Sequence, residues 1–379
     1  MPEKIKKIFY IAHCRWPNEK AHSLQIAKMC EAFRRAGVGV ELIVPRKRGA
    51  IFENPFGFYG LRETFSLTRL WTVDIVPTAA WGFFISSFVF GWSAFFYLWP
   101  KRKEGILYSI DLDPLSFVGL LFLRCSVFFE IHGPKKKTIL NRLLFRKMGG
   151  AFAVNEAIKT DLVVNFPWLK DKIIVCPNGV DLEEDTEIDK TVSRQKLEIP
   201  VGAKAVVYTG SFQSWKGIET IVEAAKKLPA IDFYLVGGSV QELTQLLSGP
   251  VPSRVHCLEA RPHSEMPWWR AAADLLLVTG TKKDRYSYYH TSPMKLFEYL
   301  AARRPIVASR TPAIEQAVSD QEVFFCESDD VEDLAETIEE VFVHPELALK
   351  KAELAYGKAR QYSWANRVRI TLDFINQQL

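Results

Sequence analysis

The chain has 379 residues, with 49 Lys plus Arg against 44 Asp plus Glu and a formal net charge of +5 at pH 7. This length exceeds what one typical hydrophobic core holds, so we expect two α/β domains with a ligand cleft between them. The charge excess is too small to indicate a nucleic-acid-binding protein. The 6 cysteines are scattered without a CxxC pair, which argues against a zinc site and indicates the reduced thiols of a cytoplasmic protein.

Apolar, strand-forming runs alternate with helical patterns through the first half of the chain. The runs are KIFYIAH, VELIVP, ILYSID, VFFEIH, AFAVN and IIVCPNG. They are apolar throughout rather than alternating, which is typical of parallel strands covered by helices on both faces. Between the first two runs, residues 22–36 show the apolar spacing of a helix and stop at Gly37. This order predicts a Rossmann-like first domain.

An uncharged, aromatic-rich segment, residues 75–100, is followed directly by Lys101, Arg102 and Lys103. Its length suits a membrane span. The prolines, glycines and hydroxyl side chains within it favour instead a surface helix that faces a membrane, or a buried core helix. All three interpretations stay open, and we predict residues 75–103 as the site of peripheral contact with the inner face of the cell membrane.

The second half of the chain repeats the alternating pattern of the first. A polar segment with few large apolar residues follows Asp181, and we expect the interdomain linker there. The runs AVVYTG, DFYLVGG, VHCLE, LLLVTG, PIVASR and VFFCES come after it. They predict a second parallel sheet with helices on both faces. The C-terminal stretch is predicted to be an amphipathic helix. Its periodicity alone does not show to which domain the helix belongs.

The segment 290–309 begins with the signals of a helix N-terminus. Thr291 or Ser292 is a suitable N-cap, and Pro293 suits the first turn, so we expect a helix over residues 293–302. Pro305 then opens a strand. The helix N-terminus would lie at the edge of the second sheet, where ligands bind in folds of this type.

The expected helix combines an anion site with a carboxylate. Backbone N–H groups near Met294 and Lys295, at the positive end of the helix dipole, favour a diphosphate. Glu298 lies about 7 Å further along the axis, at about 1.5 Å per residue, within reach of the ribose hydroxyls beside such a diphosphate. An ordinary capped helix with a solvated Glu298 explains the same spacing.

A second segment, residues 206–223, points to the same kind of ligand. A strand ends in a Thr-Gly-Ser turn, and Lys216 with Gly217 opens the next helix. We expect Lys216 at the same crevice, where a cation stabilises the charge that develops on a departing diphosphate.

Together these segments resemble the large family four of retaining glycosyltransferases, which has the GT-B fold. The motifs that carry the resemblance are NGVD (178–181), YTGSFQSWKGIE (208–219), YLVGG (234–238), residues 266–277 and SPMKLFEYLAARRPIVAS (292–309). QYSWANR, residues 361–367, is similar to the family's closing segment, after which the last helix crosses back to the first domain. The resemblance implies two Rossmann-like domains, residues 1–184 with 362–379, and residues 185–361.

The resemblance also implies the reaction and its substrates. The donor would be a UDP-sugar, with glucose as the best candidate, and the acceptor a glycan or a lipid-linked molecule of polysaccharide or glycolipid biosynthesis. No cofactor, metal or nucleic acid is implied. Lys216 matches the family's diphosphate-binding lysine, and Glu298 its ribose-binding carboxylate. His132 matches a histidine that points at the donor sugar near the reacting carbon, and a structural core histidine is the alternative.

Further positions carry over with less pattern behind them. Arg261 and Pro262 fall where the family holds the nucleotide base. Lys20, His22 and Ser23 follow the first strand, in the place of acceptor or phosphate contacts, but the usual pair of glycines is missing from this loop.

Two departures from the family's pattern fall in the donor site. Ser211 stands where the family often has an arginine, and His290 stands where it often has a sugar-binding glutamate. Both departures leave the identity of the donor sugar open. A nucleotide-sugar epimerase of the same fold and a non-catalytic nucleotide-sugar-binding protein are therefore alternatives to a transferase. Asp111 and Asp113 resemble the Asp-x-Asp metal site of the other large glycosyltransferase fold, but the two-sheet pattern favours a metal-independent enzyme.

Overall fold

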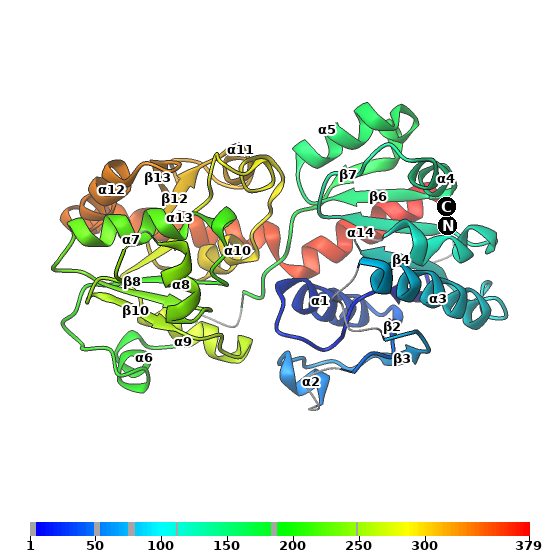
Figure 1. Ribbon diagram of the computed structural model, residues 1–379, viewed down its shortest axis with the longest axis horizontal. Helices are drawn as coiled ribbons and strands as arrows, with labels where there is room; N and C mark the ends of the chain where they lie inside the picture. Colours follow the sequence, from blue (N-terminus) through cyan, green and yellow to red (C-terminus); the bar gives the residue numbers. More distant parts are fainter. Residues whose placement is uncertain (1–4, 49–53, 75–79, 111–112, 183–187, 248) are drawn as a thin grey trace. The chain divides into compact units, whose positions relative to one another are not determined.

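The computed structural model describes residues 5–48, 54–74, 80–110, 113–182, 188–247 and 249–379. The chain divides into two compact units (Figure 1). Unit 1 comprises Met1–Pro177 and Trp364–Leu379, and unit 2 comprises Asn178–Ser363. The boundaries predicted from the sequence were 184/185 and 361/362.

Unit 1 is built on a parallel sheet of 7 strands in the order β3-β2-β1-β4-β5-β6-β7. The strands are β1 (Lys7–Ile11), β2 (Gly39–Pro45), β3 (Ser66–Leu70), β4 (Ile106–Ile110), β5 (Val127–Ile131), β6 (Gly150–Ala153) and β7 (Ile173–Val175). All except β3 coincide with predicted apolar runs. β3, with the sequence SLTRL, was missed because an edge strand with half-exposed polar residues gives no continuous apolar run.

Helices cover both faces of this sheet. They are α1 (Ala21–Arg35), α2 (Pro55–Phe58), α3 (Ala80–Leu98), α4 (Ile139–Lys147), α5 (Glu156–Asn165) and α14 (Trp364–Gln378), with short turns η1 (Pro114–Phe117), η2 (Gly119–Phe122) and η3 (Pro167–Lys172). The predicted first helix is confirmed as α1. It stops because Gly37 adopts φ +82°, a left-handed conformation that ends a helix and that glycine adopts without strain.

Helix α3 occupies the apolar segment that the sequence left open between three interpretations. Its inner residues Phe90, Ala94 and Leu98 are buried, whereas Trp81 and Phe96 on its other side are exposed. Residues 81–98 are long and apolar enough to cross a membrane, and 39% of this window is buried inside the structure. The helix is therefore a covering helix of unit 1 with one exposed face, and not a wholly buried core helix. Residues 75–79 lie outside the described part of the chain.

The C-terminal helix α14 belongs to unit 1, as the resemblance implied. Its Arg367 forms a buried ion pair with Glu130 of β5, with Nη2 2.6 Å from Oε1 and Nη1 3.2 Å from Oε2. Burial alone would raise the pKa of Glu130, but the charge of Arg367 and hydrogen bonds from His132 and Arg367 hold it well below its usual range. Tyr108 and Gln25 also donate hydrogen bonds to this carboxylate. The ion pair is thus fully satisfied inside the unit.

Unit 2 contains a parallel sheet of 6 strands in the order β10-β9-β8-β11-β12-β13. The strands are β8 (Ala205–Thr209), β9 (Asp232–Val236), β10 (Val255–Leu258), β11 (Leu275–Val278), β12 (Ile306–Arg310) and β13 (Phe324–Glu327). Each coincides with a predicted apolar run. The helices and short turns are α6 (Lys190–Lys196), η4 (Ser214–Lys216), α7 (Ile218–Lys227), α8 (Val240–Leu246), η5 (His263–Glu265), α9 (Met266–Ala272), η6 (Tyr286–His290), α10 (Met294–Ala301), α11 (Pro312–Glu315), α12 (Val331–Val343), α13 (Pro345–Ala359) and η7 (Arg360–Tyr362).

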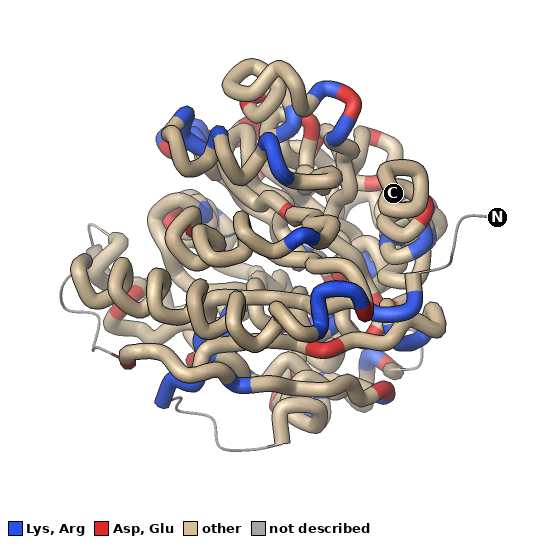
Figure 2. The backbone as a smooth tube through the Cα atoms, turned by 90° about the vertical axis from the view of Figure 1, so that its right-hand side faces the viewer, with Lys and Arg blue, Asp and Glu red and all other residues tan. Residues whose placement is uncertain are grey.

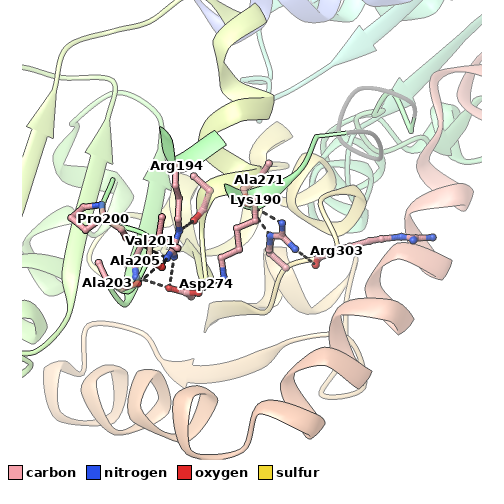
Figure 3. A network of polar contacts seen from close by, with 11 residues as sticks. Lys190, Arg194, Pro200, Val201, Ala203, Ala205, Ala271, Asp274 and Arg303 are labelled. Carbon is pink, nitrogen blue, oxygen red and sulfur yellow. Dashed lines mark hydrogen bonds and ion pairs between the residues drawn. The ribbon is translucent and has the colours of Figure 1, made fainter. Parts of the chain in front are cut away.

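The polar segment predicted as a linker contains α6, which is an integral part of unit 2. Arg194 of α6 is buried and donates hydrogen bonds to Asp274, at 2.7 Å, and to backbone carbonyl groups such as that of Ala203 (Figure 3). Asp274 in turn accepts from the backbone N–H of Ala205 at the start of β8. The linker prediction was therefore wrong for this helix, because a buried ion pair and not an apolar stripe holds it in place.

In both sheets the strand order reverses at one point, between β1 and β4 in unit 1 and between β8 and β11 in unit 2. In doubly wound sheets, ligands bind outside the carboxyl ends of the strands at this reversal. Each unit therefore has one favoured location for a ligand.

Replacing Arg367 by Met is expected to destabilise the protein by about 3–5 kcal/mol, because the change leaves the Glu130 carboxylate buried without its cation. The matched control is Arg369→Met, which removes an exposed arginine of the same helix and its ion pair with exposed Asp373. The control is expected to change little. Equilibrium unfolding in denaturant measures both variants. Equal stability of the two would contradict the assignment.

Candidate functional site

The candidate site of unit 2 lies at the carboxyl ends of β8 and β11. Gly210 follows β8 with φ +137°, a conformation that other residues rarely adopt. A Cβ atom at this position would lie 3.3 Å from Nζ of Lys295, 3.4 Å from the hydroxyl oxygen of Tyr208 and 3.7 Å from Nζ of Lys216. Two ammonium groups, from separate segments of the chain, therefore approach the same stretch of backbone.

Lys216 is held by the turn that precedes α7. Gly217 adopts φ +68° and allows the chain to turn from η4 into the helix. Thr279, after β11, donates a hydrogen bond of 2.7 Å to the backbone carbonyl of Lys216. The ammonium group donates to the hydroxyl of Ser211 at 2.7 Å. Burial lowers the pKa of Lys216 from 10.5 to about 8. Lys216 thus lies after β8, with its ammonium group beside the turn at Gly210, and its role remains a prediction.

Lys295 contributes a buried ammonium group that the sequence did not predict, since only its backbone N–H was expected to act. Its Nζ lies 3.5 Å from the centroid of the Tyr208 ring and has no hydrogen-bond partner among the described residues. Burial, and secondly the charge of Lys216, holds the pKa of Lys295 well below the ordinary lysine value. A buried, unpaired cation is costly, and an anion bound here would compensate it.

The helix that carries Lys295 begins without a side-chain cap. α10 runs over Met294–Ala301, close to the predicted range, but its N-cap is Pro293 and no side chain caps its first turn. The prediction of Thr291 or Ser292 as N-cap was wrong, because the π-helical turn η6 ends directly before Thr291. The carbonyl of Ser292 instead accepts from the side-chain amide of Asn178 at 2.7 Å. The N–H groups of Met294 and Lys295 therefore begin the helix without competition from a cap.

Tyr299 anchors α10 to the end of β8. Its hydroxyl accepts a hydrogen bond from the backbone N–H of Thr209 at 2.8 Å. Since Lys295 and Glu298 lie on the same short helix, this contact fixes both relative to the end of β8.

Glu298 is not the solvated carboxylate of an ordinary surface helix. Its Oε2 accepts from Nη1 of Arg270 at 3.1 Å, and its Oε1 lies 3.2 Å from Nε2 of His263. Arg270 is fully buried in α9, and the Glu298 side chain is 13% exposed. The carboxylate is therefore held in place by two partners, with a small exposed part. Sequence reasoning missed both partners, although a lone arginine within the apolar α9 was a signal.

The other residues predicted to contact the donor differ in their exposure. Arg261 and Pro262 are exposed and directly precede His263, so the segment predicted to hold the base lies beside Glu298. His290 is buried at the end of η6, and Ser211 is exposed beside Lys216.

In unit 1, His132 follows β5 and is oriented by a carboxylate. Its Nε2 lies 2.6 Å from Oε1 of Glu130. Because Arg367 keeps Glu130 ionised, the carboxylate accepts and Nε2 of His132 donates, so Nδ1 is the ring nitrogen that Glu130 does not engage. The ring of His22 lies 6.4 Å from that of His132, edge to face. This contact brings together two residues predicted separately.

The remaining predicted acceptor contacts differ in accessibility. Lys20 is exposed at the start of α1, whereas Ser23 is buried within the unit. Of the three residues predicted in this loop, Lys20 and His22 therefore remain at the surface.

A polar cluster at the β1/β4 reversal of unit 1 was missed from the sequence. His13 lies 3.1 Å from Oδ2 of Asp113 through Nδ1, and 3.2 Å from Nζ of Lys47 through Nε2. Asp113 also accepts from the backbone N–H of Ser116 at the start of η1. Asp111, the other half of the Asp-x-Asp motif, lies outside the described residues. Within the described residues there is no group of three or more His, Cys, Asp or Glu placed to hold a metal ion.

Comparison with known proteins agrees with this geometry. Residues 203–343 match the family model of glycosyl transferases group 1. A D-inositol 3-phosphate glycosyltransferase of Mycolicibacterium smegmatis is 27% identical over 210 residues, which cover 52% of this chain and 46% of the relative. The matching region spans about half the length of such curated relatives.

Solved structures with the same fold cover almost the whole chain. Sucrose-phosphate synthase from Thermosynechococcus elongatus superposes with a TM-score of 0.76 and 17% identity, over 97% of each chain. Anabaena HepE in complex with UDP-glucose gives a TM-score of 0.72 and 17% identity, over 98% of this chain and 97% of that one. The two parallel sheets and these neighbours confirm the α/β fold with two Rossmann-like domains. The chain thus has the GT-B fold, and its residues 203–343 match the family model of glycosyl transferases group 1.

Proposed function

We propose that this protein is a retaining glycosyltransferase that transfers a hexose, with glucose as the best candidate, from a UDP-sugar to a glycan or lipid-linked acceptor. The observation that carries the proposal is the pair of ammonium groups of Lys216 and Lys295 beside Gly210. The ammonium group of Lys295 is buried without a hydrogen-bond partner among the described residues, so the site is short of an anion. A diphosphate supplies that charge. The family match over the same residues supports it.

The reaction follows from the charges around the diphosphate. The bond between the anomeric carbon and the diphosphate oxygen breaks, and its electron pair leaves with the UDP. Lys216, Lys295 and the N-terminus of α10 stabilise the negative charge that develops there. The acceptor oxygen bonds to the same face of the sugar and passes its proton to the departing phosphate oxygen. No nucleophile of the protein takes part, and no metal is required.

Two carboxylates of the protein have supporting roles in this proposal. Glu298, held by Arg270 and His263, accepts hydrogen bonds from the ribose hydroxyls. Glu130 orients the ring of His132, whose Nδ1 contacts a hydroxyl of the donor sugar. Ser211 takes the place of a family arginine, and the ammonium group of Lys295 supplies a second cation at the same turn.

Replacing Lys216 by Ala is expected to lower turnover of the donor by about 100-fold or more, because a preorganised cation at the leaving group is lost. The matched control is Lys226→Ala on α7, the helix that follows Lys216, where the exposed lysine pairs with Glu223. Candidate nucleotide sugars are first ranked by thermal shift, and proton NMR of the products then follows hydrolysis and transfer. Equal rates for parent and Lys216→Ala contradict the assignment, an isomerised sugar nucleotide indicates an epimerase, and binding without turnover indicates a non-catalytic protein.

Replacing Lys295 by Met is expected to have opposite effects on stability and binding. The unliganded variant should melt at a higher temperature, since a buried unpaired cation is removed. Its affinity for UDP should fall by about 10- to 100-fold, the range of a lost charge-assisted hydrogen bond. Thermal unfolding with and without UDP, together with calorimetric titration, measures both effects. Unchanged UDP affinity would remove Lys295 from the diphosphate site.

The affinity for UDP is expected to fall as the pH rises above about 8, the value to which burial lowers the pKa of Lys216. Above that pH the free protein has lost the proton on this lysine, so binding of the diphosphate must take up a proton. The affinity then falls by up to about tenfold per pH unit. UDP itself is fully ionised in this range, since the second pKa of a phosphate is about 6. Titration calorimetry in two buffers of different ionisation enthalpy detects the proton uptake, which should be smaller in Lys216→Met.

A further inference from the structure

The outer face of α3 is an exposed aromatic stripe. Trp81, Ile85, Phe88, Phe96 and Trp99 follow one another at spacings that place them on one side of a helix, with Trp92 in the same row. Trp81 is 77% exposed and Phe96 69%. Single exposed apolar residues are common on protein surfaces, but a continuous aromatic row of this length is not.

A neighbouring turn extends the stripe. Phe122 of η2 is 59% exposed, and its ring stacks on that of Trp92 at 6.1 Å with an interplanar angle of 19°. Trp92 also contacts Phe95 and Phe96. We call Trp81, Ile85, Phe88, Trp92, Phe96, Trp99 and Phe122 the α3 face.

The opposite side of α3 is fixed to unit 1. Phe90, Ala94 and Leu98 are buried among apolar residues of the core. Thr72 donates a hydrogen bond to the backbone carbonyl of Ser86, and the ring of Phe90 stacks on His13 at 5.3 Å. These contacts hold α3 against unit 1 along its length, so its outer face stays on the surface of the folded unit.

Basic residues gather near the C-terminal end of the α3 face. α3 itself contains no charged residue, and Lys101, Arg102 and Lys103 follow it after Trp99 and Pro100. Figure 2 colours Lys and Arg blue and Asp and Glu red along the backbone. The guanidinium of Arg102 lies 4.6 Å from the ring of Trp99, and Arg124 is exposed just after η2. Glu104 follows the basic run, and Lys7 pairs with it. Aromatic residues bordered by cations are the two elements that bind a surface helix to an anionic bilayer.

We propose that unit 1 docks on the surface of an anionic lipid bilayer through the α3 face. The aromatic side chains enter the interfacial layer, and Arg102, Lys103 and Arg124 meet the lipid headgroups. A bilayer supplies anionic headgroups to these cations, and the test below separates it from a second copy of this chain.

The α3 face also lies on the same helix that contacts the favoured ligand location of unit 1. The inner side of α3 contacts His13, which pairs with Asp113 and lies beside Lys47 at the β1/β4 reversal. This reversal is the favoured ligand location of the unit. The same helix therefore joins the bilayer-facing surface to that location, as an acceptor anchored in lipid would need. This step rests on the proposed glycosyl transfer, whereas the docking itself does not.

The test is flotation of the purified full chain with vesicles of equal parts phosphatidylcholine and phosphatidylglycerol. The variant Trp81→Gln/Phe88→Gln/Phe96→Gln removes three exposed rings of the α3 face. The matched control, Val343→Gln/Leu349→Gln/Leu354→Gln, removes three exposed apolar side chains of α12 and α13 in unit 2. The parent and the control should bind the vesicles, and the α3 variant should bind at least about tenfold more weakly. Vesicles of phosphatidylcholine alone, or high salt, should weaken binding by the parent.

Three results would overturn the proposal. One is a parent protein that does not float with the anionic vesicles, and another is an α3 variant that floats as well as the parent. The third is a parent that is dimeric in solution and becomes monomeric in the α3 variant, since the face would then bind a second copy. A circular dichroism spectrum and a thermal unfolding transition like those of the parent show that the α3 variant, unit 1 included, is folded. Failure of UDP binding in the parent would contradict the proposed function and leave the docking result standing.

Discussion

The ion pair between Glu130 and Arg367 is the interaction on which unit 1 depends. It joins strand β5 to a helix from the far end of the chain, in a place where neither charge meets solvent. A buried ion pair rarely contributes net stability relative to apolar side chains, but breaking one is expensive. Here the pair has a second consequence, because the ionised Glu130 also accepts a hydrogen bond from Nε2 of His132. Through Glu130, helix α14 thus helps to orient the ring of His132, a candidate contact of the donor sugar.

In unit 2, by contrast, one buried cation has no carboxylate partner among the described residues. Arg194 and Asp274, like Arg270 and Glu298, form buried pairs that satisfy each other. Lys295 stands apart, since its ammonium group is buried against the Tyr208 ring without a hydrogen-bond partner in the described part of the chain. Such a group lowers the stability of the empty protein, and a site that binds an anion gains that energy back when the ligand arrives. This unpaired ammonium group therefore indicates the proposed diphosphate site more specifically than the positive charge of unit 2 as a whole does.

The repeated apolar runs of the sequence predicted both sheets. Elements held in place by single polar contacts could not be predicted in this way. The apolar runs gave both sheets, because strands covered on two faces must be apolar throughout. Lys216 could be placed because the turn after a parallel strand always faces the ligand edge of the sheet. β3 and α6 escaped because an edge strand and a helix held by a buried ion pair show no apolar periodicity.

The site contacts made across long stretches of chain were beyond reach for a related reason. Nothing in the local sequence shows that Arg270 meets Glu298, that Glu130 meets Arg367, or that the side chain of Lys295 turns inward. The fold alone brings these residues together. A resemblance to a family helps only at positions that the family shares. At Ser211 this chain departs from the family's pattern, and only the structure shows that the ammonium group of Lys295 approaches the same turn.

The α3 segment illustrates why composition alone could not separate three interpretations. A span, a core helix and an interfacial helix all need apolar residues, and they differ in how those residues are distributed around the helix. The buried Phe90, Ala94 and Leu98 lie on one side, and the exposed aromatic side chains lie on the other. A helix that is apolar all round yet exposed on one face retains a cost in water that its own unit does not remove. That cost, together with the cations at its end, is the physical reason to look for its partner in a bilayer.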